Sequence, residues 1–414
     1  MNEPFPGEAT FLIMAFPTPK MCSSEDKLKM SAAVKVSNSC MDFSIRLYEA
    51  CSEKNLGKDI FFSPFNVFSA LGMTLVGARH NTASQMKVTL GFGELDEKDI
   101  HDGFHEMITH LSKASKSGDL YVANRLYLQN DFSVLPTYSN ALEEKYGSSC
   151  ASVDFVNNPG EAAASINRWV AEMTKGKIQD LIQESAVNHL TRIIITCAIY
   201  FKKTWTYKFS RFNTSKAPFY ISKDNSIEVE LMFEGNKEFG FAGSKELGCK
   251  ALELLYADGL TRMLILLPDE IDGIEKVEKA LTPKALSDLL AKLNRQSVQV
   301  WLPKFKLENM FSLSKILFQM GMEDLFLSGQ ADLSGITGCS DLFVDDVVHK
   351  TFIEVNEEGT EAAAATAVSI QLTSAFFAEK PEVFRADHPF LFLIIEKTYN
   401  TVLFMGALKS PSPA

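Results

Sequence analysis

From about residue 192 onward the chain carries short segments that are rich in β-branched and aromatic residues and are bounded by turn formers. Such segments are typical of β-strands. The first half alternates instead between helical and extended patterns, with helices predicted over 39–50 and 67–76 and in 166–181, where the helix is expected to stop near Gly176. This order, with helices first and strands later, favours an α+β domain built on large antiparallel or mixed sheets. The predicted strands read IIITCAIYF, EVELMF, MLILLP, VQVWLPKF, HKTFIEV and FLFLII.

Composition predicts one large globular domain. The 414 residues are 46% hydrophobic and 22% charged, which is enough apolar material for a large core. No Gly/Ser-rich or Pro-rich linker separates one half from the other. The formal net charge is −11, and Lys and Arg occur in scattered pairs rather than in stripes. Nucleic acid is therefore not expected as a partner.

The cysteines and the first residues favour a reducing, cytoplasmic compartment. The seven cysteines are far apart and form no C-x-x-C motif, which does not fit a disulfide-built secreted fold. The apolar run 9–16 follows an acidic segment without Lys or Arg and is bounded by Pro17 and Pro19, so it does not fit a cleaved signal. Export is the alternative, and the glycosylation sequon at Asn213 matters only in that case. No apolar stretch is long enough to span a bilayer, so no membrane anchor is expected.

Motifs typical of enzymes and metal sites are missing. HDGFHEMITH (101–110) resembles the zinc-protease pattern H-E-x-x-H, but His105 and His110 are five residues apart and lie about 140° from each other around an α-helix. His101 and His105 are spaced for a pair, although two histidines without a third ligand are expected on a solvated helix face. GFGELD (91–96) lacks the third glycine of a dinucleotide loop. An enzyme is therefore possible only with a site too dispersed to recognise in one sequence, and no metal or cofactor is expected.

The segment EEGTEAAAAT (357–366) carries two conflicting signals. Alanine is the best helix former and Thr360 is a suitable N-cap, so local propensity predicts a surface helix. Alternate positions predict a strand, because one set is small and then apolar while the other is small and polar. Such a conflict marks a candidate functional site: the small side chains fit a tight slot between strands, and Gly359 frees the backbone. The two sets are Thr360, Ala362, Ala364, Thr366, Val368, Ile370, Leu372 and Glu361, Ala363, Ala365, Ala367, Ser369, Gln371, Thr373.

This segment resembles the hinge of a serpin. VVHKTFIEVN (347–356) precedes it and ADHPFLFLI (386–394) follows it, as in that family. Further family motifs occur in the family's order over nearly the whole chain from about residue 30. They are FFSPFNVFSALGMTLVGA, VANRLY, INRWVAEMTKGKI, AIYFKKTW, LPKFKLE, DLSGI and LFMG. The chain is most similar to the intracellular, ovalbumin-like branch (clade B) of the family.

The resemblance implies a single α+β serpin domain over 30–414. It has three β-sheets, about eight to nine helices and an exposed reactive-centre loop over about 357–385. Residues 1–29 are then an N-terminal extension, expected to be flexible. Asn66, Cys197 and Lys203 stand where the family usually has Ser, Asn and Gly. These departures affect details of the gate and not the fold.

The resemblance also implies a protease inhibitor that acts as a suicide substrate. The nucleophile of the target protease attacks a peptide bond of the exposed loop and forms a covalent acyl complex. The cleaved segment then enters the main sheet as a new strand. A non-inhibitory serpin that acts as a binding, chaperone or storage protein is the alternative. Such relatives carry charge or bulk in the hinge, whereas the alanines here are permissive, so inhibition is favoured.

Site residues follow from the matched positions. The hinge comprises Glu357, Glu358, Gly359, Thr360, Glu361, Ala362, Ala363, Ala364 and Ala365. The gate comprises Ser63, Asn124 and His349, where the main sheet parts, and Trp205 at the top of the sheet. His349 is equally expected as an ordinary hydrogen-bonded core histidine.

Counting from Glu357 places the reactive bond at Thr373–Ser374, which fits an elastase-like target. Leu372, Phe376, Phe377 and Lys380 are alternatives, and they imply chymotrypsin-like, cysteine-cathepsin-like or trypsin-like targets. The expected partner is the target protease, and the inhibitor itself is expected to be a monomer. A heparin site is not indicated, because 96–119 mixes acidic residues with its lysines.

Overall fold

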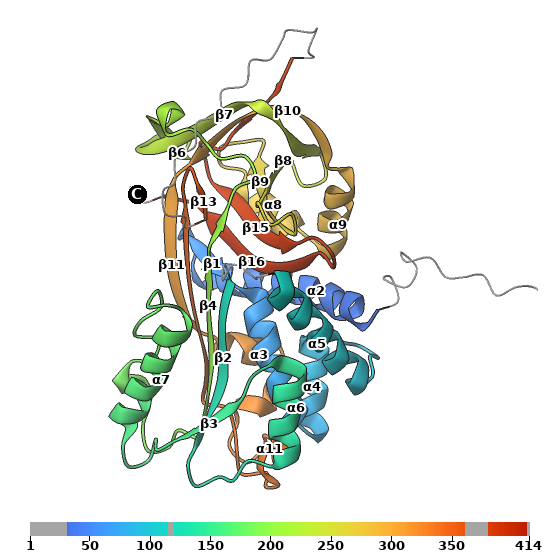
Figure 1. The fold of residues 1–414 in the computed structure, drawn as a ribbon, viewed down its shortest axis with the longest axis vertical. Coiled ribbons are helices and arrows are strands. Elements are labelled where there is room, and N and C mark those ends of the chain that lie inside the picture. Colours follow the sequence, from blue (N-terminus) through green and yellow to red (C-terminus); the bar gives the residue numbers. More distant parts are fainter. Residues whose placement is uncertain (1–30, 115–119, 361–379, 412–414) are drawn as a thin grey trace, which may run out of the picture.

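The structure is a computed structural model that describes residues 31–114, 120–360 and 380–411. Within these ranges the chain forms ten α-helices, three short 3₁₀ helices and sixteen β-strands (Figure 1). The helices are α2 (Ala32–Lys54), α3 (Pro64–Gly77), α4 (His80–Thr89), α5 (Glu97–Ala114), α6 (Pro136–Tyr146), α7 (Pro159–Met173), α8 (Ile274–Ala280), α9 (Pro283–Lys292), α10 (Ser314–Gln319), α11 (Ser334–Thr337), η1 (Glu184–Ala186), η2 (Arg211–Asn213) and η3 (Asp324–Phe326).

The main sheet has seven strands in the order β3-β2-β4-β12-β13-β5, and β11 also pairs with β12. Its strands β2 and β4 are antiparallel, whereas its central strands β4 and β12 are parallel. The strands are β2 (Leu120–Gln129), β3 (Cys150–Val153), β4 (Ile193–Phe201), β5 (Lys203–Thr204), β11 (Phe305–Ser312), β12 (Asp346–Val355) and β13 (Gly359–Thr360).

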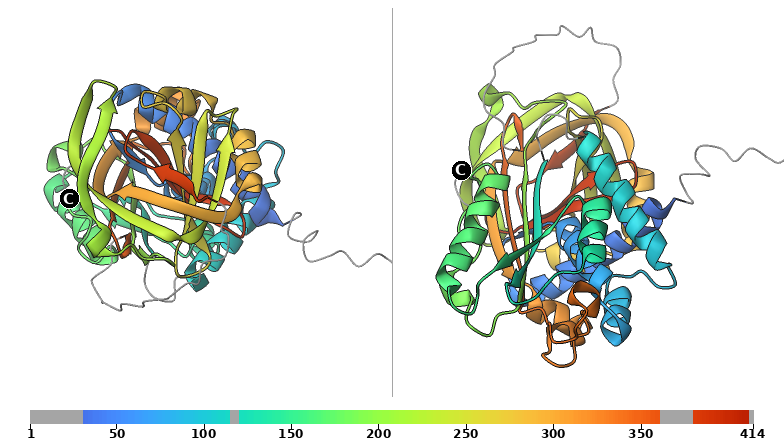
Figure 2. Two further views of the ribbon diagram at one scale, coloured as in Figure 1. Left: turned by 90° about the horizontal axis from the view of Figure 1, so that it is seen from above. Right: turned by 60° about the horizontal axis from the view of Figure 1, so that its bottom comes forward.

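Both faces of the main sheet are covered, as Figures 1 and 2 show. Every residue of β4 is buried. Ile195 and Ile199 belong to the large core beneath α3, whereas Ile194 and Ala198 pack in the smaller core under α7. A strand with two buried faces reads as a continuous apolar run. This explains why IIITCAIYF lacks the polar alternation of a half-exposed strand.

Helix α3 is the central helix of the large core. Its side chains are all buried except that of Val76. Ser63 caps its first turn and Pro64 occupies the first helical position, where the missing N–H of proline costs nothing. α3 contacts β2 and β4 of the main sheet and β16 of the second sheet. It therefore packs between the two sheets.

The second sheet has nine strands in the order β1-β16-β15-β9-β8-β7-β10-β14, with β6 paired to β7. Strand β7 is 20 residues long; its first part pairs with β6, its middle with β10 and its end with β8. The remaining strands are β1 (Ile60–Phe62), β6 (Ser215–Ser222), β7 (Asn225–Ser244), β8 (Cys249–Leu255), β9 (Thr261–Pro268), β10 (Asn294–Pro303), β14 (Glu382–Arg385), β15 (Phe390–Glu396) and β16 (Thr401–Leu408).

The α+β class predicted from the sequence is confirmed. The described residues form two hydrogen-bonded sheets, where three were expected, and the long strand β7 pairs with β6, β10 and β8 within one of them. Ten α-helices occur there where eight to nine were expected. The six predicted strands are present, and α7 ends at Met173, before Lys175 and Gly176 adopt left-handed backbone angles. None of the helices in the described ranges combines the length and apolarity needed to cross a bilayer.

Candidate functional site

A parallel seam between β4 and β12 divides the main sheet. The two strands pair from Ile194 with Asp346 to Tyr200 with Phe352. On either side of the seam the neighbouring strands, β2 and β11, are antiparallel to their partners. A strand running antiparallel to both β4 and β12 would therefore convert the seam into a fully antiparallel sheet, the pairing with the better hydrogen-bond geometry.

The hinge begins at the top of this seam. β13 (Gly359–Thr360) pairs with Val355 of β12 on one side and with Thr204 and Lys203 of β5 on the other, antiparallel in both cases. β5 continues the line of β4, so these two residues occupy the end of the track that a new strand would follow. A Cβ atom at position 359 would overlap the backbone of Lys203. Gly359 is therefore required for close approach of the two strands as well as for backbone freedom.

Thr360 fixes which face of the hinge points into the core. Its side chain is fully buried, and its hydroxyl lies 2.8 Å from the Tyr256 hydroxyl. Burial raises the pKa of Tyr256, so this phenol is a neutral hydrogen-bond partner. Because side chains alternate along a strand, continuation of β13 would direct position 362 and then position 364 inward. These are members of the small and apolar set recognised in the sequence.

The two glutamates of the hinge are anchored to the loop and strands above the seam. Glu357 is buried; its Oε1 accepts from the Thr214 hydroxyl at 2.8 Å and lies 3.7 Å from Lys304 Nζ. Glu358 lies 2.7 Å from Lys208 Nζ. Both contacts hold the N-terminal base of the loop in place.

Trp205 belongs to the hinge and not to the rest of the predicted gate. Its backbone N–H donates to the Glu358 carbonyl at 2.9 Å, and its Nε1–H donates to the Asn356 carbonyl at 3.0 Å. Its ring stacks on Tyr256 with 4.6 Å between centroids. The indole therefore fixes the turn that leads from β12 into β13.

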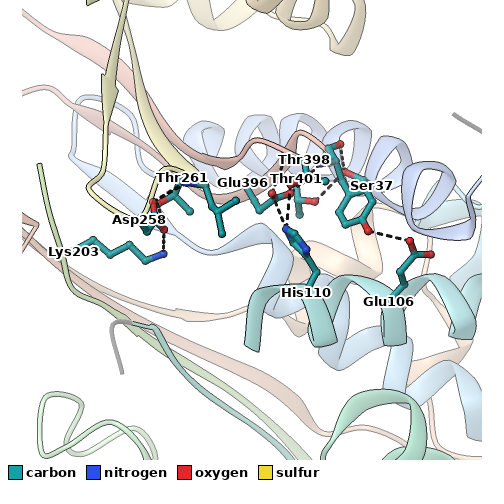
Figure 3. Close-up of polar contacts among 11 residues, drawn as sticks. Ser37, Glu106, His110, Lys203, Asp258, Thr261, Glu396, Thr398 and Thr401 are labelled. Carbon is teal, nitrogen blue, oxygen red and sulfur yellow. Dashed lines mark hydrogen bonds and ion pairs between the residues drawn. The ribbon is translucent and has the colours of Figure 1, made fainter. Parts of the chain in front are cut away.

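Below this stack lies a buried ion pair that the sequence did not indicate. The Lys203 ammonium contacts the Asp258 carboxylate, with 5% and 13% of the two side chains exposed. Burial alone would raise the pKa of Asp258, but Lys203 and the N–H groups of Thr261 and Leu260 outweigh it and hold that pKa below its usual value. The pair ties β5, the neighbour of the hinge, to the turn before β9 (Figure 3).

His349 closes the seam lower down. It is fully buried, its Nε2 accepts from the Ser63 N–H at 2.9 Å, and its Nδ1 contacts the Cys197 carbonyl at 2.7 Å. The first partner can only donate and the second can only accept, so the neutral tautomer with its proton on Nδ1 is required. Burial lowers the pKa of His349 to about 4, and the hydrogen bond to Cys197 offsets this only in part.

Ser63 and Asn124 meet His349 at this level of the sheet. Ser63 donates from its hydroxyl to the Leu403 carbonyl at 2.6 Å, so it joins β12, α3 and β16. Asn124, Cys197 and His349 are successive partners across β2, β4 and β12. Asn124 Nδ2 donates to the Asn66 carbonyl of α3 at 3.1 Å. Three of the four predicted gate residues therefore form one buried cluster around the start of α3.

This arrangement has counterparts among known proteins. A family model described as "Serpin (serine protease inhibitor)" matches residues 38–411. The leukocyte elastase inhibitor A of Mus musculus is 40% identical over 375 residues, which are 89% of this chain and 97% of that protein.

The chain belongs to the serpin family.

Further relatives agree with this assignment. The leukocyte elastase inhibitor of Sus scrofa is 42% identical over 375 residues, again 89% of this chain and 97% of that protein. The crystal structure of Serpin48 from the insect Tenebrio molitor superposes with a TM-score of 0.81 at 31% identity, over 91% of this chain and 98% of that one. The predicted assignment to a family of protease inhibitors, and not of enzymes, is thereby confirmed.

The three histidines of α5 do not share a site in this serpin. His101 Nδ1 lies 2.7 Å from the Tyr146 hydroxyl, and burial lowers the pKa of His101 to about 4. His105 contacts the Glu144 carbonyl, and His110 lies 3.2 Å from the buried Glu396 carboxylate (Figure 3). The expectation that His101 and His105 form a solvated face is wrong for His101, because α6 packs over it.

Most residues of the predicted reactive-centre loop lie outside the described part of the chain. Among the predicted sites these are Glu361, Ala362, Ala363, Ala364, Ala365, Leu372, Thr373, Ser374, Phe376 and Phe377. The predicted N-terminal extension (1–29) lies outside it as well. Description resumes at Lys380, which is exposed. Sequence reasoning missed Tyr256 and Lys304, which contact the hinge, and Asp258, which pairs with Lys203 beside it. All three are distant from the hinge in the chain.

Proposed function

We propose that this serpin inhibits serine proteases of the elastase type, with Thr373–Ser374 as the reactive bond. The observation that carries the proposal is the position of β13. Its two residues already pair with β12 and β5 at the end of the β4/β12 seam, in the antiparallel direction that insertion requires. The next positions of the inward set, Ala362, Ala364 and Thr366, are small. No charged residue stands on the inward set from Thr360 to Leu372.

Insertion supplies the driving force for trapping. The new strand separates the parallel pairs of the seam and forms antiparallel ladders with both neighbours. Roughly a dozen additional hydrogen bonds at about 0.5–1.5 kcal/mol each give on the order of 10 kcal/mol, to which burial of Val368 and Ile370 adds. Because this is comparable to the stability of a whole domain, the uncleaved form is held by a kinetic barrier.

The same movement displaces the attached protease. An inserted strand of about 14 residues at about 3.3 Å each carries the acyl-enzyme some 45 Å along the sheet. The displacement distorts the active site of the enzyme before water can release it. The expected product is a covalent acyl complex between one inhibitor molecule and one protease molecule.

The names of the relatives support an elastase-type target. Proteins called leukocyte elastase inhibitor are about 40% identical to this chain over nearly their whole length. Their names favour inhibition over the alternative of a carrier or storage protein. Chymotrypsin-like proteases and cysteine cathepsins are the other targets to be compared in the experiment below.

We further propose that the inhibitor is a cytoplasmic monomer that acts without heparin. The six cysteines in the described ranges are free thiols. Burial raises the pKa of Cys40 and of Cys51 to about 12, so these thiols remain protonated and unreactive at neutral pH. Such a set of unpaired thiols suits a reducing compartment.

The test is incubation with equimolar elastase, chymotrypsin, trypsin and a cysteine cathepsin, followed by a denaturing gel. A complex that survives denaturation is expected with elastase. The released peptide is expected to begin at Ser374, which mass spectrometry measures. Cleavage at the same bond without a stable complex would contradict trapping. A stable complex with a different new N-terminus would contradict the assigned bond but support the mechanism.

A further inference from the structure

The pairing of β13 fixes the register of any strand that continues it into the seam. Thr360 lies opposite Lys203 of β5 and opposite Val355 of β12, antiparallel to both. Each further residue of such a strand meets the preceding residue of both neighbours. Lys203 and Val355 are 152 positions apart, as are Ile194 and Asp346, which already pair across the seam. The strand can therefore enter by lateral separation of β4 and β12, without a slip along either of them.

The same register places the foot of the seam at Ile193 and Asp345. Ten residues beyond Thr360, position 370 comes between these two residues. They lie one step below the first pair of the β4/β12 ladder. Insertion of the segment as far as Ile370 therefore has to separate Ile193 from Asp345.

Asp345 crosses the seam at this point. Its carboxylate Oδ2 accepts from the Arg192 N–H at 2.6 Å and from the Ile193 N–H at 3.0 Å. Its own N–H donates to the Ile193 carbonyl at 2.9 Å. Both backbone polar groups of Ile193 are therefore bound by Asp345, and the carboxylate takes the place that the carbonyl of a neighbouring strand would have. Hydrogen bonds to a charged acceptor are stronger than those between neutral groups.

The next aspartate along the chain makes its contacts away from the seam. Asp346 Oδ1 accepts from the Val347 N–H at 2.8 Å and from the Ser314 N–H, just beyond β11, at 3.3 Å. Of the two aspartates, only Asp345 therefore joins β12 to β4. Burial raises the pKa of Asp345, although its two N–H donors oppose this. The fold thus keeps a carboxylate at a place that disfavours its charge.

We propose that Asp345 is a clamp on the foot of the seam, which the inserting strand has to release last. When position 370 enters, its backbone binds Ile193 in place of Asp345, and the carboxylate loses both of its donors. The clamp therefore stabilises the intact form and not the cleaved form, so it opposes the completion of insertion. This inference rests on the insertion step of the proposed function and not on the identity of the target protease.

The experiment compares the thermal unfolding of intact and cleaved full-length protein. The cleaved form is cut once between 371 and 385, as verified by mass spectrometry, and all samples contain the same concentration of guanidinium chloride. Asp345→Ala is expected to lower the melting temperature of the intact form by about 2–4 °C, because two N–H groups lose their acceptor. The melting temperature of the cleaved form is expected to stay unchanged or to rise. An equal decrease in both forms would overturn the proposal.

Two further variants separate the clamp from general destabilisation. Asp346→Ala is the matched control, because its contacts lie outside the track, and it is expected to lower the melting temperatures of both forms alike. Asp345→Asn keeps an uncharged acceptor and is expected to lower the melting temperature of the intact form by less than Asp345→Ala does. Asp345→Asn decides the matter if Asp345→Ala does not fold. A decrease in both forms of Asp345→Asn would likewise contradict the clamp.

A second measurement tests the register. Synthetic peptides with the sequences of 361–372 and 361–367 are titrated into the intact protein. The longer peptide reaches Ile193 in this register, whereas the shorter one ends before it. Asp345→Ala is expected to tighten binding of the longer peptide about fivefold and to leave binding of the shorter one unchanged. Equal tightening of both peptides would show that the whole seam is loosened, and this would exclude a clamp at its foot.

Failure of the proposed function gives a different result. If the cleaved wild-type protein melts at the same temperature as the intact one, insertion does not occur and the clamp is overturned with it. If the variants behave as expected but no complex forms with elastase, the clamp is supported and the proposed target is wrong.

Discussion

The middle and the top of the β4/β12 seam are held closed by different kinds of interaction. At the gate, His349 joins Ser63 and Cys197 through neutral hydrogen bonds in a fully buried setting. At the hinge, Glu358 and Lys203 belong to ion pairs whose members are partly or wholly screened from water. The gate therefore depends on the protonation state of one ring, whereas the hinge depends on charge pairing. The predictions below separate these two dependences.

The largest effect is expected from a charge on the inward set of the hinge. Ala364→Arg would have to bury an unpaired guanidinium during insertion, and this costs several kcal/mol. The variant is expected to become a substrate, with at least tenfold more inhibitor cleaved per protease molecule inhibited. The measurement is the stoichiometry of inhibition.

The matched control for this variant is Ala363→Arg, on the outward set of the same segment. Its side chain would point to the other face of the inserted strand, so a much smaller loss is expected. Thr360 is less suitable for the test, because it is buried before cleavage. Equal inhibition by the two alanine variants would contradict the alternation inferred from Thr360.

Loss of the buried ion pair is expected to be the largest change in stability. Lys203→Met leaves the Asp258 carboxylate buried without its cation, which is expected to cost about 3 kcal/mol of unfolding free energy. The double variant with Asp258→Asn removes the isolated charge and is expected to recover most of this loss. Urea unfolding at pH 7 measures both. A double variant as unstable as the sum of the single ones would show that the two side chains are not coupled.

The contribution of the gate to the unfolding free energy is expected to change between pH 6.5 and pH 4, whereas that of the hinge is not. The unfolded chain binds a proton at a histidine near its ordinary pKa of about 6.5, whereas His349 in the fold resists protonation until about pH 4. The stability that this ring contributes is therefore complete above pH 6.5 and decreases as the pH falls toward 4. At pH 5 the loss is about 2 kcal/mol.

The comparison uses His349→Gln, whose amide can donate to Cys197 and accept from Ser63 but does not titrate. The quantity measured is the change in unfolding free energy between pH 7 and pH 5 in each protein. His101, whose pKa burial also lowers to about 4, is present in both and cancels. The same pH dependence in the two proteins would contradict the assignment to His349.

The smallest effect is expected at the exposed end of the hinge. Lys208 is half-exposed in its pair with Glu358, and such pairs contribute about 0.5 kcal/mol or less and weaken with salt. Lys208→Gln is expected to change thermal stability slightly at low salt and not at 1 M salt. Lys216→Gln, which removes an exposed pair with Glu228 on β6 and β7, is the control for loss of a surface charge. A large effect of Lys208→Gln at high salt would show that its packing, and not its charge, supports the hinge.

Local sequence predicted much of the frame. The segment IIITCAIYF predicted a strand at 193–201, and the helix predicted over 67–76 lies within α3. The alternation from Thr360 onward predicted which side chains of the hinge face inward, and the burial of Thr360 agrees with it. These features depend on residues close together in the chain, where strand and helix periodicities apply directly.

Tertiary structure decided what holds the seam closed. Thr360 contacts Tyr256, and Lys203 pairs with Asp258, across separations of 104 and 55 residues. Trp205 was grouped with Ser63, Asn124 and His349 from the sequence, yet it lies with the hinge. One sequence carries no local signal for such pairs, because their two side chains come together only after distant strands have paired. The sequence by itself therefore determined which segment can enter the sheet as a strand. The fold determined the contacts that hold the seam closed, at the gate and at the hinge.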